Sequence, residues 1–283
     1  MVHIEVIKTT GDRLKTAPLA IIGGRGVFTK ELEEALLDER IDIAVHSLKD
    51  LPTTLPEKLA ITAIIEREDA RDALVLRADW LVNGSSSGAS LQALPEGASI
   101  GTSSLRRLAQ LKHLRPDCNI RELRGNVDTR LRKLDTGDYD AIVLAAAGLN
   151  RLGFAHRISA VIESKDMLSA IGQGALGIET RAQDHAVNNI VARLDDTPTR
   201  LACTAERALL RALGGGCQLP IAGHAVVHEG RLRLEGLVAA PTGERIVRDS
   251  LEGPAAEAAR IGEDLAARLH GAGAATLLAE IAI

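Results

Sequence analysis

Short apolar runs alternate with amphipathic segments along the first half of the chain. Ile4–Ile7 and Ile41–His46 are patterned as short buried strands, and apolar spacing between them predicts a helix near Thr29–Glu39. The alternation continues with strands at Asp69–Leu76, Ala98–Gly101, Asn119–Leu123 and Tyr139–Leu144, and helices at Ser104–Leu114 and Val127–Leu134. Strands that alternate with helices at this spacing favour parallel α/β sheets.

The last third of the chain has a different pattern. A helix at Leu201–Leu213 precedes three alternating segments, Ala222–Val227, Arg231–Ala239 and Arg245–Leu251, which are separated by turn residues. A long Ala-rich helical stretch, Pro254–Leu269, follows them. This pattern predicts a small antiparallel sheet covered by a helix, which is a separate α+β domain.

Composition narrows the class of protein. The 283 residues are 46% hydrophobic and 25% charged, which is typical of a globular protein with two or three domains. Only four residues are aromatic, so we expect no surface that stacks nucleic-acid bases. No apolar run reaches about 18 residues and no charged-then-apolar leader opens the chain, so we expect a cytoplasmic protein without a membrane span. The three cysteines, Cys118, Cys203 and Cys217, are too scattered for a disulfide framework or a metal site.

Positive charge is concentrated in one part of the chain. Residues 101–135 carry a net charge of +5, although the whole chain is at −4, and most of their basic residues are arginines. Arginine forks suit carboxylates and phosphates. Basic groups also follow the predicted strands, in His46–Pro52, Gly101–Arg107, Leu123–Arg130 and at Arg151. Ligands bind beyond the carboxyl ends of strands in α/β sheets, so we expect these groups to meet around a polyanionic ligand. Ordinary solvated helix faces are the alternative interpretation.

Two residues could carry chemistry. Asp50, beside Lys49 at a strand end, is either a catalytic carboxylate or part of a surface ion pair or cap. Cys217 follows three glycines, so it is either an accessible nucleophile or attachment point, or a small buried thiol after a helix end. Spacing alone favours the structural reading in both cases. His46 is interpreted as a core histidine, and the glycine-rich stretch Gly172–Gly177 as a crossover between domains.

Taken in order, the motifs resemble one known family. They are His46–Pro52, Gly101–Arg107, Leu123–Arg130, Ala170–Gly174 and Glu206 followed by Gly215–Pro220. From about Lys8 onward this combination closely resembles porphobilinogen deaminases, also called hydroxymethylbilane synthases. The resemblance implies two α/β domains like those of periplasmic binding proteins, joined by crossover segments, and a small C-terminal α+β domain. We therefore expect domain 1 at 1–67 with 173–194, domain 2 at 68–172 and domain 3 at 195–283.

The resemblance also implies an activity and a set of site residues. It indicates a monomeric transferase of tetrapyrrole biosynthesis, which joins four porphobilinogen molecules head to tail on a covalent dipyrromethane cofactor and binds no metal. Cys217 would hold the cofactor through a thioether, and Asp50 would be the catalytic carboxylate. The other cofactor-binding positions would be Ser47, Lys49, Thr102, Ser103, Ser104, Arg106, Arg107, Arg124 and Arg130. The substrate-binding positions would be Arg25, Phe28, Arg151 and Gln173.

The sequence departs from the family pattern in two ways. The Thr-Arg-x-Ser-x-Leu-Ala-x-x-Gln motif of the family's first strand and helix is absent, which would leave a sheet edge unpaired and apolar surface exposed. A wrongly assigned start, a fragment or an impaired product would each explain this. Ile21 also stands where the family often has a lysine. The alternatives to an active deaminase are a non-catalytic anion-binding module of the periplasmic-binding-protein fold and a degenerate family member.

Overall fold

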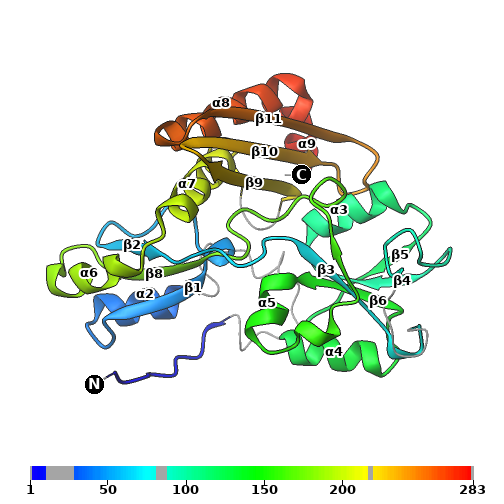
Figure 1. Ribbon diagram of the computed structural model, residues 1–283, viewed down its shortest axis with the longest axis horizontal. Coiled ribbons are helices and arrows are strands. Elements are labelled where there is room, and N and C mark those ends of the chain that lie inside the picture. The colour runs from blue at the N-terminus through cyan, green and yellow to red at the C-terminus, as the bar shows by residue number, and fades with distance from the viewer. Residues whose placement is uncertain (1, 11–28, 81–87, 216–218, 282–283) are drawn as a thin grey trace.

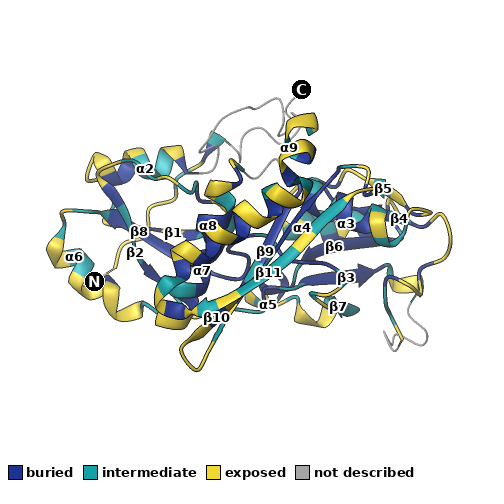
Figure 2. Ribbon diagram, turned by 90° about the horizontal axis from the view of Figure 1, so that it is seen from above, coloured by how far each residue is buried: buried dark blue, intermediate teal, exposed yellow. Residues whose placement is uncertain are grey.

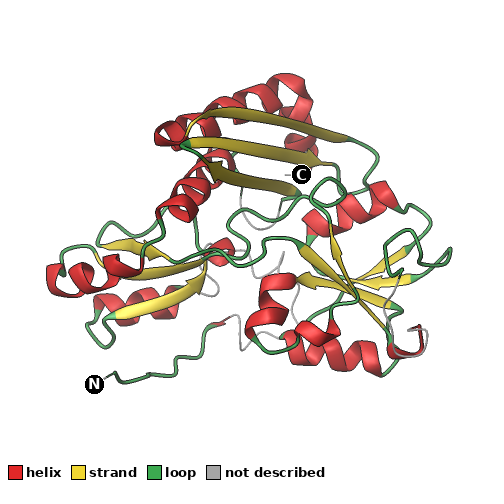
Figure 3. Cartoon of the chain, in the orientation of Figure 1, coloured by secondary structure: helices red, strands yellow, loops and turns green. Residues whose placement is uncertain are grey.

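The computed structural model describes residues 2–10, 29–80, 88–215 and 219–281, and these residues form three β-sheets with helices packed on them (Figure 1). Two sheets lie side by side in the lower half of the view, and the third lies above them (Figure 3). The described part contains no helix that is long and apolar enough to cross a membrane.

The first sheet has three strands, and both of its strand pairs are antiparallel. In spatial order the strands are β1 (Ile43–Ser47), β8 (Leu176–Arg181) and β2 (Leu59–Ile64). Two helices belong to this part of the chain, α2 (Lys30–Leu37) and α6 (His185–Val191). Leu36 of α2 packs against Ala44 and Leu59, which anchors the helix on the sheet.

The beginning of the chain differs from the sequence prediction. Residues 2–8 form no strand, and Val2, Ile4 and Val6 are between 84% and 89% exposed, so the predicted buried strand Ile4–Ile7 is wrong. Alternation shows a preference for extended backbone, but a strand also needs a partner. The predicted strand Ile41–His46 is present as β1, although it lies at a sheet edge with every second residue exposed.

The second sheet has five strands of mixed direction. In spatial order they are β5 (Asn119–Arg121), β4 (Ser99–Gly101), β6 (Ala141–Ala145), β3 (Asp72–Leu76) and β7 (Ala160–Ile162). The expected parallel pairing is confirmed for β4 with β5 and β6, but β3 runs antiparallel to both neighbours, as do all strands of the first sheet. An apolar pattern predicts that a segment is a strand of the sheet. It does not show whether that strand runs parallel or antiparallel to its neighbours.

Helices cover both faces of the second sheet. They are α3 (Leu105–Leu114), α4 (Val127–Asp135) and α5 (Ala146–Arg151). The central strands β3 and β6 are buried on both faces, which explains their continuous apolar runs (Figure 2). Ser104 is the N-cap of α3, as the sequence indicated, and its hydroxyl accepts from the backbone N–H of Arg107 at 3.4 Å.

The third sheet confirms the predicted α+β unit. Its antiparallel strands, in order, are β11 (Ile246–Pro254), β10 (Arg231–Ala239) and β9 (Ile221–His228). Its helices are α7 (Thr197–Ala212), α8 (Ala258–Leu269) and α9 (Ala275–Ile281). Gly262 brings α8 against α7, because a Cβ at this position would lie 2.3 Å from the carbonyl oxygen of Ala205.

Two connections join the first and second sheets. One leads from β2 to β3 and the other from β7 to β8, and the N–H of Glu68 in the first donates to the carbonyl of Gly174 in the second at 3.1 Å. Gly174 has a φ of +86°, and a Cβ there would lie 2.3 Å from the carbonyl oxygen of Glu68. The interpretation of the glycine-rich stretch as a crossover is therefore confirmed.

Candidate active site

Asp50 lies in a short turn that leaves the edge of the first sheet. Leu48–Asp50 forms one 3₁₀ turn, η1, directly after β1. Leu48 and Leu51 are 1% and 3% exposed, so these two side chains anchor the turn in the core. Asp50 as a whole residue is exposed to solvent, yet protein surrounds its carboxylate closely enough that burial raises its pKa, against the opposing effects of Lys49, His46 and Arg130.

Asp72, at the start of β3, is the centre of a buried hydrogen-bond network. Its carboxylate accepts from Nη1 of Arg106 at 2.7 Å, from Nη2 of Arg107 at 2.8 Å and from Nε2 of Gln173 at 2.9 Å. Burial acts to raise the pKa of Asp72, but the two guanidinium groups and the hydrogen bonds hold it well below its usual range. The buried carboxylate of Asp72 is therefore ionised at any pH near neutral.

The two arginines of α3 are buried and engaged within the protein. Arg106 also donates to the carbonyl of Leu168 at 2.7 Å, and Arg107 to that of Val143 at 3.0 Å. Nε of Arg106 is buried without a hydrogen-bond partner among the described residues. The expected role of both arginines in binding ligand carboxylates stays a prediction. In the structure, each guanidinium group already donates hydrogen bonds to Asp72.

Lys49 and Arg130 are cations whose charges are disfavoured by their surroundings. Nζ of Lys49 donates to Oε1 of Gln173 at 3.4 Å, and burial lowers the pKa of Lys49 to about 8. Burial and, after it, the charge of Arg107 lower the pKa of Arg130 to about 10. Both shifts mean that an added negative charge would stabilise these side chains.

These groups interact electrostatically with one another across the two lower sheets. We call them the charged cluster, which consists of Lys49, Asp50, Asp72, Arg106, Arg107 and Arg130. Within it, four cations face two carboxylates. The cluster therefore has a positive excess, which suits a ligand that carries carboxylates.

The other predicted site residues lie around this cluster or outside the described part. Thr102 is buried at the end of β4, and its hydroxyl accepts from the N–H of Ser104 at 3.2 Å. Arg151 ends α5, where a turn was expected, and Nη2 donates to the carbonyl of Gly174 at 2.8 Å. Arg124 pairs with Glu122 at 2.5 Å near the surface. Ser47 ends β1, and Ser103 lies between β4 and α3. Residues outside the described ranges are Ile21, Arg25, Phe28 and Cys217.

Asp72 was missed by the sequence analysis, although two other residues of this region, Gln173 and His46, were named. Asp72 begins the apolar strand DALVL, and a lone acid in a buried strand is a signal that it needs a cationic partner. Gln173, predicted to bind substrate, is fully buried and bridges Lys49 and Asp72. His46 is a core histidine, as interpreted, and its Nε2 lies 3.0 Å from Oε2 of the buried Glu179.

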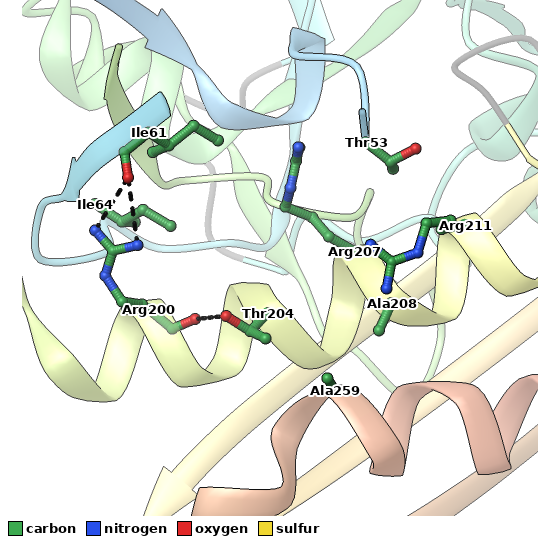
Figure 4. Close-up of a pocket in the computed structure, with 9 residues that line it drawn as sticks. All are labelled: Thr53, Ile61, Ile64, Arg200, Thr204, Arg207, Ala208, Arg211 and Ala259. Carbon is green, nitrogen blue, oxygen red and sulfur yellow. Dashed lines mark hydrogen bonds between the residues drawn. The ribbon is translucent and has the colours of Figure 1, made fainter. Parts of the chain in front are cut away.

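A separate pocket of about 160 Å³ lies between β2 and α7 (Figure 4). Arg200, Arg207 and Arg211 of α7 line it, together with Thr53. Arg200 is neutralised by Asp195 at 2.6 Å, whereas Arg211 has a looser, half-exposed partner in Glu263 at 3.5 Å. This pocket is not lined by any member of the charged cluster.

Comparison with known proteins identifies the family. Residues 1–189 match the family model described as porphobilinogen deaminase, dipyromethane cofactor binding domain, and residues 200–271 match its C-terminal domain. A porphobilinogen deaminase of Syntrophobacter fumaroxidans is 49% identical over 280 residues, which cover 99% of this chain and 88% of that protein. One of Nitratidesulfovibrio vulgaris, strain Hildenborough, is 51% identical over 281 residues, covering 99% and 86%. The chain belongs to the porphobilinogen deaminase family, whose members are transferases.

A likeness to solved structures is weak. A substrate binding domain of a putative amino acid ABC transporter from Streptococcus pneumoniae matches with a TM-score of 0.37 and 14% identity, covering 66% of this chain and 74% of that one. A similarity at this level carries no argument about function.

The described residues fit the cofactor that this family binds. A dipyrromethane carries acetate and propionate groups, and the charged cluster presents excess positive charge and a buried Arg106 Nε that has no partner among the described residues. Lys49 and Arg130 are the cluster cations that Asp72 does not hold by a hydrogen bond, so they are the members best placed to pair with such carboxylates.

Proposed function

We propose that this chain joins four porphobilinogen molecules head to tail into hydroxymethylbilane, with loss of ammonia, and that Asp50 is the catalytic carboxylate. The observation that carries the proposal is that Asp50 is the exposed member of a cluster with excess positive charge. A cationic surface attracts the carboxylates of the substrate, while a single carboxylate within it is available to the reacting centre.

The environment of Asp50 suits a group that holds and moves protons. Loss of ammonia from porphobilinogen leaves a delocalised cation, and an anionic carboxylate beside it stabilises that charge. Burial raises the pKa of Asp50, which makes its carboxylate a stronger base than an exposed aspartate. No described residue donates a hydrogen bond to this carboxylate, so its oxygens are open to pyrrole N–H groups.

The cationic residues bind and orient the carboxylates. Lys49 and Arg130 pair with them directly, while Arg106 and Arg107 add positive charge from beneath and are themselves held in place by Asp72. Ser47, Thr102, Ser103, Ser104, Arg124 and Arg151 are the further binding positions that the family motifs indicate. When bound, the dipyrromethane supplies the primer to which new pyrrole units are joined, and Cys217 is its attachment point.

The arrangement of sheets supports three domains. We infer domain 1 at 1–67 with 173–194, domain 2 at 68–172 and domain 3 at 195–283, because each range holds one sheet and its helices. The crossovers at 65–71 and 163–175 are the segments about which the first two domains could move. We expect a monomer in solution.

Two variants test the proposal. Intact mass spectrometry of the purified wild type should show the added mass of a dipyrromethane, and Cys217→Ser should lack it. Cys118→Ser is the matched control, because Cys118 is a buried thiol far along the chain from Cys217, and this variant should keep the added mass. Asp50→Asn should keep the cofactor but lose turnover by about 100-fold or more.

The outcomes separate the candidate functions. An unmodified wild-type chain would favour the non-catalytic anion-binding module, which has no use for Cys217. A modified chain in which Asp50→Asn turns over porphobilinogen at the wild-type rate would contradict the role of Asp50 but not the family activity.

A further inference from the structure

The loop that carries Asp50 is held by a residue of the third sheet's helix. Nη1 of Arg207 in α7 donates to the carbonyl of Leu51 at 3.2 Å, and Nη2 donates to the carbonyl of Pro52 at 2.5 Å. These two carbonyls follow Asp50 directly and lie beyond the last paired residue of β1. A single planar fork thus binds two consecutive peptide groups.

Apolar packing on the same helix supports the fork. Cys203 precedes Arg207 by one helical turn, so both project from the same side of α7. Cys203 is fully buried in one cluster with Leu48 and Leu51, the two residues that anchor the Asp50 turn. The loop is therefore held by the apolar contacts of Leu48 and Leu51, and by the hydrogen bonds from the guanidinium group to the carbonyls of Leu51 and Pro52.

In the sequence, helix α7 comes shortly before the predicted cofactor cysteine. It ends at Ala212, and Cys217 follows five residues later in the sequence. From Arg207 to the end of the helix the rise is about 7.5 Å. One rigid element thus holds the Asp50 loop and starts the segment that bears Cys217.

We propose that Arg207 is a positioning residue, which holds the 48–52 loop so that Asp50 keeps its distance to the reacting ring. This inference rests on the proposed function of Asp50. Its neighbour in the pocket, Arg211, provides a contrast, because it points along α7 and pairs with Glu263 rather than with the loop (Figure 4).

The experiment compares three variants of the full chain. Arg207→Met removes the guanidinium group and keeps much of the apolar stem. Arg207→Lys keeps the positive charge but offers a single ammonium group to the two carbonyls. Arg211→Met is the matched control. Turnover number, KM, cofactor mass and thermal unfolding are measured for each. We expect Arg207→Met to keep its cofactor and a KM within about twofold while kcat falls roughly 10- to 100-fold, since small displacements of a reacting group have effects of this size.

Arg207→Lys should recover part of this loss, and Arg211→Met should behave as the wild type. If Arg207→Met does not fold, the test rests on Arg207→Lys, which should also show a lower kcat with a nearly unchanged KM. A wild-type kcat in a folded Arg207 variant overturns the proposal.

Hydrogen exchange gives a readout that does not depend on catalysis. Peptides that cover residues 46–55 should exchange faster in Arg207→Met than in Arg211→Met, because two hydrogen bonds to the loop are lost. If these peptides exchange in Arg207→Met at the wild-type rate, the proposal is overturned. It is also overturned if they exchange faster but Arg207→Met keeps the full turnover number. Full turnover by Asp50→Asn would contradict the proposed catalytic role of Asp50, although not the family activity. A kcat loss in Arg207→Met could then not act through Asp50, which also overturns the positioning role.

Discussion

Lys49 and Asp50 are neighbours in sequence whose proton affinities are shifted by the same cause. Burial disfavours both charges, so it raises the pKa of Asp50 and lowers that of Lys49 to about 8. Each charge opposes the shift of the other. Lys49 is therefore a cation at neutral pH, and it loses its proton as the pH rises through about 8. Carboxylate binding by this residue should depend on pH for that reason.

Replacement of Lys49 should change the alkaline side of the pH profile. Lys49 is protonated below its pKa, so kcat/KM for porphobilinogen should fall as the pH rises through about 8. Lys49→Arg keeps a cation at every accessible pH and should shift this loss upward, whereas Lys49→Met should lower kcat/KM at all pH values and flatten the limb near 8. The profile is measured from pH 6 to 10 for the three proteins. An unchanged limb in both variants would assign that titration to another group.

The environment of Arg106 and Arg107 marks a limit of prediction from sequence at the residue scale. Their position after a strand placed them near a ligand crevice, and the structure does bring them into the charged cluster. The sequence could not show that Asp72 lies between them, because a pairing over 34 and 35 residues leaves no periodic pattern. Only the isolated acid at the head of a buried strand pointed to it.

At the scale of elements, prediction succeeded where the pattern is local. The three strands of the third sheet and helices such as α3 were predicted within a few residues, since period, caps and turns are all written in neighbouring positions. Strand β2, by contrast, was not predicted, and β3 runs in a direction that the sequence did not indicate. Both adjoin the crossover at 65–71, where the chain changes sheets and long-range pairing decides the outcome.

Gly262→Ala should destabilise the packing of α8 on α7. The new methyl group would meet the carbonyl oxygen of Ala205 at 2.3 Å and the side chain of Ala208 at 2.8 Å, so the two helices would have to separate. We expect a loss of about 1–3 kcal/mol or more in the free energy of unfolding. Gly271→Ala is the control, since a Cβ there meets nothing within 4 Å. Equal midpoints in urea for the two variants would show that α8 adjusts without cost.

At the scale of the whole molecule, one buried ion pair ties the three sheets together. Glu206 of α7 accepts from Nη1 of Arg67, which belongs to the crossover after β2, at 2.5 Å. The same carboxylate accepts from the N–H of Gly172 in the second crossover at 2.6 Å and from the N–H of Ala225 in β9 at 2.8 Å. Arg67 donates in turn to the carbonyl of Gln173 at 2.8 Å. Movement between the sheets must therefore pivot around this pair or break it.

Removal of both partners should cost less than the sum of the two single removals. Arg67→Met or Glu206→Met leaves a buried charge uncompensated, so we expect each to lower the free energy of unfolding by about 3–5 kcal/mol. The double variant has no such charge, and its loss should fall short of the sum of the single losses by more than about 1 kcal/mol. Urea unfolding of the four proteins measures this coupling. The exposed pair of Arg231 and Glu252 is the control, because both side chains are more than half exposed and their coupling should stay below about 1 kcal/mol. Additive losses at Arg67 and Glu206 would mean that water reaches the pair once either side chain is shortened, and the sheets would then be joined by their apolar contacts instead.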